Sequence, residues 1–166
     1  FEIKKNNSTA ILPTQFNIPI INIKNEKIIL EGNIDFNKNT IYENPVEVKE
    51  GTVINLCEKC SLIFKNKVQI NGHKNKPVIV KGINNKKWGS IGILGQNTKG
   101  SKLHNLRIEG GSGAKVDGVY FYAALSINDT SNIDISGLLM KNNYDYDDML
   151  HIIYSNNINI DNSKFV

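Results

Sequence analysis

Five residues in the C-terminal third are candidates for catalytic chemistry. They are Lys115, Asp117, Asp147, Asp148 and His151. An elimination on a uronic-acid polymer needs a cation to neutralise the carboxylate and a base to remove the C5 proton. A histidine titrates near neutrality and can act as the base, while paired carboxylates are also the tools of glycoside hydrolysis. The pattern therefore predicts an enzyme acting on acidic polysaccharide as one hypothesis.

The same acidic cluster has two other interpretations. Asp145, Asp147 and Asp148 could bind Ca²⁺, because this ion prefers carboxylate oxygen ligands. They could also form an exposed acidic loop in front of a strand. On a strand, Asp147 and His151 would share one face and Asp148 the other, since successive side chains alternate.

Basic residues gather in the middle of the chain. Residues 1–58 carry 6 Lys and 8 acids, residues 59–108 carry 10 Lys, one Arg and no acid, and residues 109–166 carry 3 Lys and 8 acids. A positive band attracts anionic polymers. The candidate ligand-binding residues are Lys65, Lys67, Lys81, Lys102, Arg107 and Trp88. The expected partner is a polysaccharide or an anionic cell-wall polymer, although a solvated lysine-rich surface explains the same pattern. Nucleic acid is not expected, because no known motif or aromatic interleaving accompanies the charge.

Aromatic residues offer surfaces for sugar rings. Trp88 is the single Trp, and it either packs at a corner of the fold or forms a stacking platform. Further aromatic residues cluster towards the C-terminus, and an outward-facing subset could stack on sugars. They are Tyr120, Phe121, Tyr122, Tyr144, Tyr146 and Tyr154.

Two cysteines, Cys57 and Cys60, stand in the motif Cys-Glu-Lys-Cys. A structural zinc site usually needs four ligands, and no second cysteine pair accompanies this one. A redox Cys-x-x-Cys motif normally opens a helix within a βαβ unit, which the pattern does not indicate. We therefore interpret the pair as two turn cysteines or a local disulfide.

An internal repeat predicts the elements that position these residues. Residues 125–140 match residues 150–165 at an offset of 25, and a third copy at residues 103–108 matches residues 135–140 at an offset of 32. The longer offset fits an inserted loop at residues 110–118. The matched pairs are Leu125 with Leu150, Ile127 with Ile152, Asn132 with Asn157, Ile133 with Ile158, Ile135 with Ile160, and Met140 with Phe165.

Each copy contains short runs of alternating apolar residues that are broken by Asn, Ser or Gly. Such a period is typical of a solenoid, in which like residues stack on like residues. Asn132 over Asn157 would be a rung of an asparagine ladder. Further strands are predicted at residues 18–23, 27–30, 46–48, 53–56, 62–64, 68–70, 78–81 and 90–94, with corners at Gly51, Gly72, Gly82, Gly89 and Gly100.

Composition agrees with this interpretation. The chain has 25 Asn and 25 Ile in 166 residues. Isoleucine suits strands and asparagine suits tight turns, although codon bias would also raise both. We predict an all-β fold, a right-handed parallel β-helix, with an irregular cap segment at residues 1–40 and coils at residues 41–166. Leucine is too sparse for a leucine-rich repeat.

The ends of the chain carry expectations of their own. The sequence begins without Met and without a signal peptide, so we expect a processed product or a fragment. It stops in mid-coil, so we expect further coils or a neighbouring domain in the parent protein. No apolar run is long enough for a membrane span.

Residues 46–166 resemble right-handed β-helix repeat proteins, an architecture shared by pectate lyases and many secreted bacterial surface proteins. Three motifs resemble more narrowly the β-helix region beside spore-coat-H-type kinase-like domains: Trp88-Gly-Ser-Ile91, the loop at residues 110–118, and Asp147-Asp-Met-Leu-His151. The kinase-like domain itself is not in this sequence. The resemblance implies the fold and a secreted or cell-surface location, and it does not imply an activity.

Two functions follow as hypotheses. The first is a non-catalytic module that binds anionic glycan or scaffolds a surface protein. The second is a polysaccharide lyase or related enzyme. An acid and a base converging on one groove point would favour the enzyme, and a row of exposed aromatics would favour binding. This fold hosts both classes, so only the site can decide.

Overall fold

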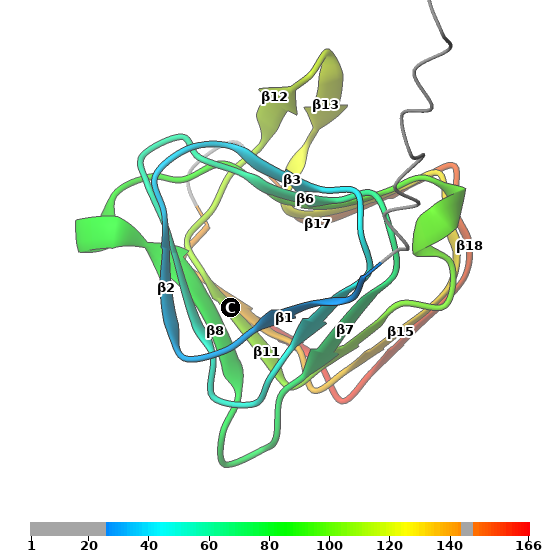
Figure 1. Cartoon of the computed structure of the whole chain (residues 1–166), viewed down its shortest axis with the longest axis horizontal. Coiled ribbons are helices and arrows are strands. Elements are labelled where there is room, and N and C mark those ends of the chain that lie inside the picture. The colour runs from blue at the N-terminus through cyan, green and yellow to red at the C-terminus, as the bar shows by residue number, and fades with distance from the viewer. Residues whose placement is uncertain (1–25, 144–147) are drawn as a thin grey trace, which may run out of the picture.

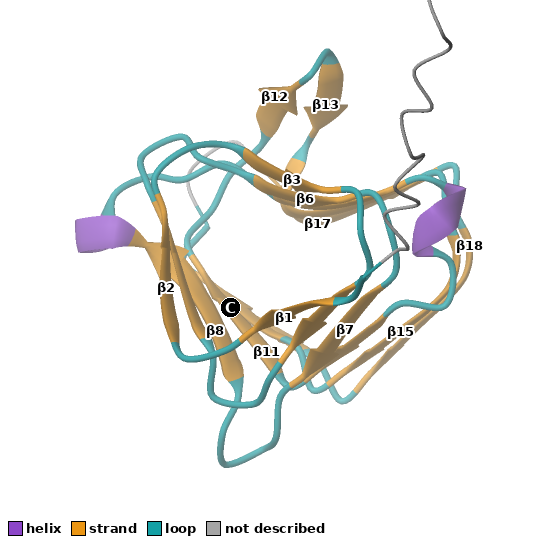
Figure 2. Cartoon of the chain, viewed as in Figure 1, coloured by secondary structure: helices purple, strands orange, loops and turns teal. Residues whose placement is uncertain are grey.

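The chain folds almost entirely into β-strands arranged in three parallel sheets (Figure 1). The computed structural model describes residues 26–143 and 148–166. Consecutive strands go to the three sheets in turn, so the chain winds round a common core and loops join the sheets at the corners (Figure 2). We call each set of three consecutive strands a coil. The topology is compatible with a parallel β-helix.

Sheet A contains, in spatial order, β1 (Ile28–Leu30), β4 (Val46–Val48), β7 (Val68–Asn71), β10 (Lys102–His104), β15 (Ser131–Ser136) and β18 (Asn156–Asp161). Sheet B contains β2 (Asn33–Phe36), β5 (Val53–Leu56), β8 (Val78–Gly82), β11 (Leu106–Glu109), β16 (Leu139–Lys141) and β19 (Lys164–Phe165). Sheet C contains β3 (Thr40–Tyr42), β6 (Leu62–Phe64), β9 (Ile91–Leu94), β14 (Ala123–Asn128) and β17 (Asp148–Ile153). An antiparallel hairpin of β12 (Ala114–Val116) and β13 (Val119–Phe121) interrupts the fourth coil, and 3₁₀ turns η1 (Ile83–Asn85) and η2 (Gln96–Thr98) lie at corners.

The strand register confirms the repeat predicted from the sequence. All the apolar pairs at offset 25 are register partners between neighbouring coils. The third copy is also correct, since Leu103 pairs with Ile135 and Ile108 with Met140. Asn157 Nδ2 donates a hydrogen bond of 3.0 Å to Asn132 Oδ1, and both residues have left-handed backbone. The predicted asparagine rung is therefore present.

The core lies inside the coils, where apolar side chains from all three sheets meet. Alternation along each strand sends every second residue inward, as in β4, where Val46 and Val48 are buried and Glu47 points outward. Aromatic rings also stack between coils, with Tyr42 and Phe64 centroids 5.8 Å apart. Burial of these side chains is the main term that stabilises the stack.

The hairpin β12–β13 stands out above sheet C (Figure 1). Its inward residues Val116 and Phe121 form a second apolar cluster with Ile63 on the outer face of that sheet. Gly92 provides the space, because a Cβ there would lie 2.5 Å from the Phe121 ring. The inserted segment is therefore a docked hairpin, and not the plain loop predicted at residues 110–118.

Most predicted strands occur where the alternation placed them, and three, at Val46–Val48, Val53–Leu56 and Leu62–Phe64, have the predicted bounds. The boundary predicted at residue 40 falls inside β3, and β1 and β2 pair with the next coil as later strands do. The strand predicted at residues 18–23 lies outside the described residues. Within the described part, no helix has the length and apolar character needed to cross a membrane.

Candidate functional site

The exposed face of the hairpin carries a row of aromatic and basic side chains. Lys115 and Tyr120 are opposite each other in the hairpin register, and the Lys115 ammonium lies 4.7 Å from the centre of the Tyr120 ring. Tyr120 stacks on Tyr122 with centroids 5.8 Å apart and planes 14° apart. Tyr120 and Tyr122 are 52% and 54% exposed as whole residues, so this stacked pair is open to solvent.

His151, on strand β17 of sheet C, continues the series of hairpin side chains, because its ring contacts the Tyr122 ring. Ile63, Gly92, Ser126 and His151 are register partners on successive strands and form one row on the outer face. The hairpin covers the Ile63 end, while the His151 ring lies 5.4 Å from the Tyr122 ring in an edge-on arrangement. We call Lys115, Tyr120, Tyr122 and His151 the aromatic strip.

Two buried polar atoms lie on this face without a hydrogen-bond partner among the described residues. They are His151 Nδ1 and Asn128 Oδ1. Asn128 is two residues beyond Ser126 on β14, and His151 is the register partner of Ser126. Buried polar atoms are almost always paired in proteins, so two orphaned atoms on neighbouring strands indicate a position where a ligand group or water would bond.

Of the five residues predicted to be catalytic, the four that the structure describes lie at separate positions on the hairpin and on β17. Lys115 and His151 lie at opposite ends of the aromatic strip, with both tyrosine rings between them. Asp117 lies in the two-residue turn of the hairpin, and Asp148 is exposed at the start of β17. Asp147 lies outside the described residues. The expected outward orientation of His151 is confirmed, because Leu150 pairs with core residue Leu125.

The predicted Ca²⁺ ligands Asp145 and Asp147 also lie outside the described residues, which leaves Asp148 alone. In residues 26–143 and 148–166, no three His, Cys, Asp or Glu side chains gather in a way that could hold a metal ion. The predicted Ca²⁺ site thus lies mainly outside the described residues.

Trp88 is buried, with 1% of its surface exposed. Its indole N–H donates a hydrogen bond of 3.0 Å to the Glu109 carbonyl, and Gly111 packs against its ring. This geometry corresponds to the corner-packing alternative, because a covered ring cannot stack on a sugar. Trp88 therefore acts as a structural residue and not as a ligand-binding platform.

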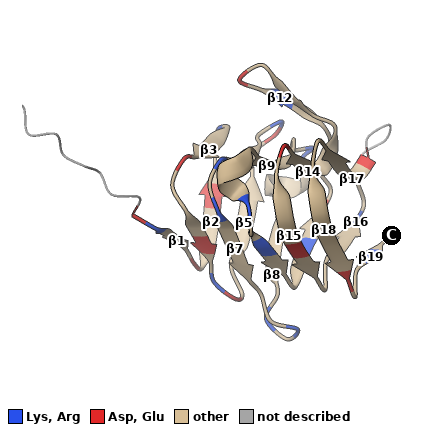
Figure 3. Cartoon of the chain, turned by 90° about the vertical axis from the view of Figure 1, so that its right-hand side faces the viewer, with Lys and Arg blue, Asp and Glu red and all other residues tan. Residues whose placement is uncertain are grey.

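The basic residues of the middle segment point in different directions, because each coil turns through three sheets. Lys102 is on sheet A, Lys81 and Arg107 are on sheet B, and Lys65 and Lys67 follow sheet C. Acidic partners also intervene, as Lys65 bonds to Glu43 at 3.0 Å. Figure 3 shows acidic and basic segments interspersed along the side of the stack. The basic residues at positions 59–108, which are close together in the sequence, therefore do not form one continuous positive surface.

Sheet A illustrates this interleaving. Glu47, Gln69, Lys102, Asp134 and Asn159 form one outward row. Hydrogen bonds from Asn159 and His104 hold the pKa of Asp134 below its usual value. Hydrogen bonds from Lys27 and Lys49 lower the pKa of Glu47 to about 2. Acids and bases from adjacent coils therefore neutralise each other.

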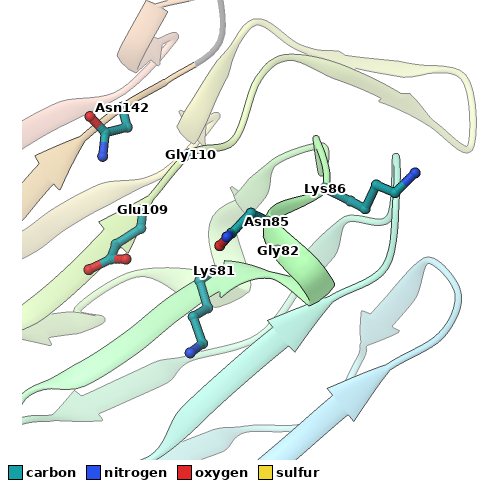
Figure 4. Close-up of a pocket in the computed structure, with 7 residues that line it drawn as sticks. All are labelled: Lys81, Gly82, Asn85, Lys86, Glu109, Gly110 and Asn142. Carbon is teal, nitrogen blue, oxygen red and sulfur yellow. The ribbon is translucent and has the colours of Figure 1, made fainter.

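A groove of about 310 Å³ on the sheet B side has the same mixed character (Figure 4). Lys81 and Glu109 belong to neighbouring strands, and Lys86 points away from both. Lys141 forms an ion pair of 3.0 Å with Glu109. Lys86 also pairs with Glu58 at 3.4 Å, so the lining combines an acid with cations that have acidic partners nearby and is not uniformly basic.

A different groove, at the base of the hairpin, contains two cations that sequence reasoning missed. Lys59 and Lys87 line it together with Lys115. Lys59 lies in the turn closed by the disulfide between Cys57 and Cys60. No spacing in the sequence relates these three lysines, since they meet only in the fold. The hairpin, in contrast, had a local signal, because Asp117-Gly118 between valines is typical of a two-residue hairpin turn.

Comparisons with known proteins identify no relative: no family model matches the sequence, and no curated protein or solved structure is significantly similar. The function must therefore be argued from the geometry of the chain itself.

Proposed function

We propose that this chain is a right-handed parallel β-helix module of an extracytoplasmic protein and that it binds anionic glycan without catalysing a reaction. The observation that carries the proposal is the exposed Tyr120–Tyr122 pair, flanked by Lys115 and His151. Exposed aromatic rings in a row provide flat apolar surfaces for sugar rings. The Lys115 ammonium adds a positive charge at one end.

The docked hairpin supports this role because it makes the aromatic strip rigid. Val116 and Phe121 anchor its inner face on sheet C, so Tyr120 and Tyr122 on the outer face have a fixed base. A surface that is ordered before binding loses less conformational entropy when the ligand arrives. A hairpin without this anchor would present the same rings less effectively.

The disulfide supports an extracytoplasmic location. Cys57 and Cys60 are bonded to each other, and disulfides persist mainly in oxidising compartments. The sequence left open two turn cysteines or a local disulfide, and the bonded pair agrees with the second alternative.

Lyase activity is the alternative function, supported by the buried Nδ1 of His151 that lacks a partner among the described residues. In that reaction a base would take the C5 proton, the C4–O bond would break, and a C4=C5 double bond would form. The base and the neutralising cation must reach the same sugar. Lys115 and His151 are separated by two rings, so the arrangement favours binding over elimination.

The test is calorimetric titration with a galacturonic acid hexamer. We expect Tyr122→Ala to weaken binding about fivefold, since an aromatic stacking contact contributes roughly 1 kcal/mol. Tyr154→Ala is the matched control, because Tyr154 is 85% exposed in the turn after β17 and lies outside the aromatic strip. Equal affinity for wild type and Tyr122→Ala would refute the proposal.

An absorbance assay separates binding from elimination. Incubation of the wild-type protein with the same hexamer should produce no unsaturated product. Product that forms with wild type and disappears with His151→Ala would establish the lyase alternative.

A further inference from the structure

A groove of about 410 Å³ lies at the corner where the chain passes from sheet A to sheet B. Residues 72–77 connect β7 to β8 at this corner, whereas Asn105 alone connects β10 to β11. The longer connection projects beyond the other turns (Figure 1) and contributes one side of the groove. We call this hollow, which Lys74, Asn105, Arg107 and Asn162 help to line, the corner groove.

Stacked turn residues from three coils form the base of the corner groove. Asn105, Gly137 and Asn162 follow β10, β15 and β18, and their φ angles are 48°, 67° and 48°. A Cβ at Gly137 would lie 2.8 Å from Asn105 Oδ1, so glycine leaves space for the Asn105 amide. Asn105 Nδ2 in turn donates a hydrogen bond of 3.0 Å to the Gly72 carbonyl. The base is therefore fixed, and it presents amides and no acid.

Backbone hydrogen bonds order the longer connection. His73 and Lys76 each donate to the carbonyl of the other, at 3.0 Å and 2.9 Å. The Gly72 N–H donates to the His104 carbonyl of the next coil at 3.0 Å. Lys74 lies in the two-residue turn between His73 and Lys76, so its backbone position is set before a ligand binds.

Two cations from different elements line the corner groove. Arg107 is an exposed residue of β11, and Lys74 is an exposed residue of the longer connection. Within residues 26–143 and 148–166, neither side chain forms an ion pair, and the described lining contains no acid. Two positive charges on one concave surface attract an anion.

The acids beside the corner groove are bound to other groups. Both carboxylate oxygens of Asp161 accept hydrogen bonds from Asn162, from the backbone N–H at 2.8 Å and from Nδ2 at 2.7 Å. Glu109, two residues beyond Arg107 on β11, forms its ion pair of 3.0 Å with Lys141. These acids therefore do not neutralise the two groove cations.

The two cations differ in type, and this difference favours one class of anion. The Arg107 guanidinium presents its donors as a planar fork that matches two oxygens of one group, while Lys74 adds a point charge on a flexible stem. A carboxylate has one negative charge and two oxygens. A phosphate monoester carries about −1.5 to −2 charges at pH 7 and three acceptor oxygens, so it can use both cations at once.

We infer that the corner groove is a binding site for phosphate, either free or as a monoester, with Arg107 as the bidentate partner and Lys74 as the second cation. Leu139, the half-buried register partner of Arg107, offers an apolar contact for the group that carries the phosphate. The hairpin with its aromatic strip and the longer connection lie on opposite sides of the coils (Figure 1). The inference therefore goes beyond the proposed function and does not depend on it.

The experiment uses three ligands that share one sugar and differ in one group: glucose 6-phosphate, glucuronic acid and glucose. NMR titration at pH 7.5, above the second phosphate pKa of about 6, measures each affinity and locates the ligand through the Arg107 side-chain and Gly137 amide signals. The proteins are the wild type, Arg107→Gln, Arg107→Lys, Lys74→Gln and Lys99→Gln. Lys99 is exposed, belongs to the same basic segment and does not line the corner groove, so its variant is the matched charge control.

We expect glucose 6-phosphate to bind more tightly than glucuronic acid, and glucose to cause no shifts at the corner groove. Arg107→Gln should weaken binding of glucose 6-phosphate about tenfold, because it removes charge-assisted hydrogen bonds. Arg107→Lys should retain part of the affinity, since it keeps the charge and loses the fork. Lys74→Gln should weaken binding about two- to fivefold, as for exposed ion pairs, and Lys99→Gln should match the wild type. Thermal unfolding of each variant confirms that the fold is retained.

Equal affinities of the wild type for glucose 6-phosphate and glucuronic acid would overturn the assignment to phosphate. Wild-type affinity of the Arg107→Gln protein would overturn the corner groove itself. Tyr122→Ala should leave this binding unchanged, and a loss with that variant would place the phosphate at the hairpin instead. Inorganic phosphate separates the two sources: tighter binding of inorganic phosphate supports a site for the free ion, and tighter binding of glucose 6-phosphate supports a site for a monoester. The galacturonic acid hexamer tests the aromatic strip separately, so either proposal can fail without the other.

Discussion

The hairpin docks closely on sheet C because residue 92 is a glycine, which has no side chain to contact Phe121. Substitution of Gly92 tests this explanation. A Cβ at position 92 would lie 2.5 Å and 2.9 Å from two atoms of the Phe121 ring and 2.7 Å from Ile63 Cδ1. Contacts this close force the neighbours to move, and overpacking of this kind costs about 1–3 kcal/mol. Alanine normally suits a strand interior better than glycine, so intrinsic propensity alone would predict the opposite sign.

A double-mutant cycle isolates the steric contact. Phe121 is 2% exposed, and Phe121→Ala should cost about 3–5 kcal/mol. With the ring removed, only the flexible end of Ile63 stays close to the new Cβ and can move into the vacated space, so the double variant should be more stable than the sum of single effects by about 1 kcal/mol or more. Chemical denaturation of the four proteins supplies the free energies of unfolding.

The same variants also test the proposed glycan binding, because Phe121 lies between Tyr120 and Tyr122 in the sequence. If Gly92→Ala displaces the hairpin base, the affinity for the galacturonic acid hexamer should fall together with stability. Additive stabilities, or a Gly92→Ala protein as stable as the wild type, would refute the steric account of the docking.

Three further predictions concern the coils and the disulfide. Lys27 and Lys49 lower the pKa of Glu47 from its ordinary value of 4.5 to about 2, so the stability from these contacts is complete above pH 4.5 and is lost as the pH falls towards 2. Denaturation at pH 5 and pH 2.5 should show that Glu47→Gln destabilises the protein much more at pH 5 than at pH 2.5, and an equal effect at both would contradict this account. Asn157 has φ of 52° and donates to Asn132, so Asn157→Gly should lose mainly one hydrogen bond, about 1 kcal/mol, whereas Asn157→Ala should lose about 1–2 kcal/mol more. Thermal unfolding compares the two variants, and identical stabilities would argue against a backbone requirement. Replacement of Cys57 and Cys60 by serine opens a closed loop of four residues and should cost about 2 kcal/mol by loop entropy. Unchanged stability of that double variant, measured in urea, would show that the turn is equally restricted without the bond.

Alternation and repetition were sufficient to predict the strands and their stacking. Leu125 over Leu150 and Ile135 over Ile160 followed from an offset of 25, because a solenoid places equivalent residues of successive copies in register. The outward direction of His151 followed from the same alternation. These features are local or periodic, so they are recorded in the spacing of the residues along the chain.

The candidate site was less predictable, because it depends on what lies outside the coils. Lys115 and His151 were identified from their types, but the two tyrosine rings between them became visible only when the hairpin docked on sheet C. Trp88 offered a stacking surface by its type, and the fold buried it under Gly111. Exposure is a property of the neighbours in space, which the residue's own type does not specify.

Charge shows the same division between sequence and fold. The sequence predicts a basic band at residues 59–108, whereas the coils turn its members towards three sheets and set acids from adjacent coils among them. The fold then gathers Lys59, Lys87 and Lys115 around one groove, although Lys115 is outside that band. Periodicity along the chain determines the coils, while contacts between segments distant in the sequence determine which charges and rings share a surface.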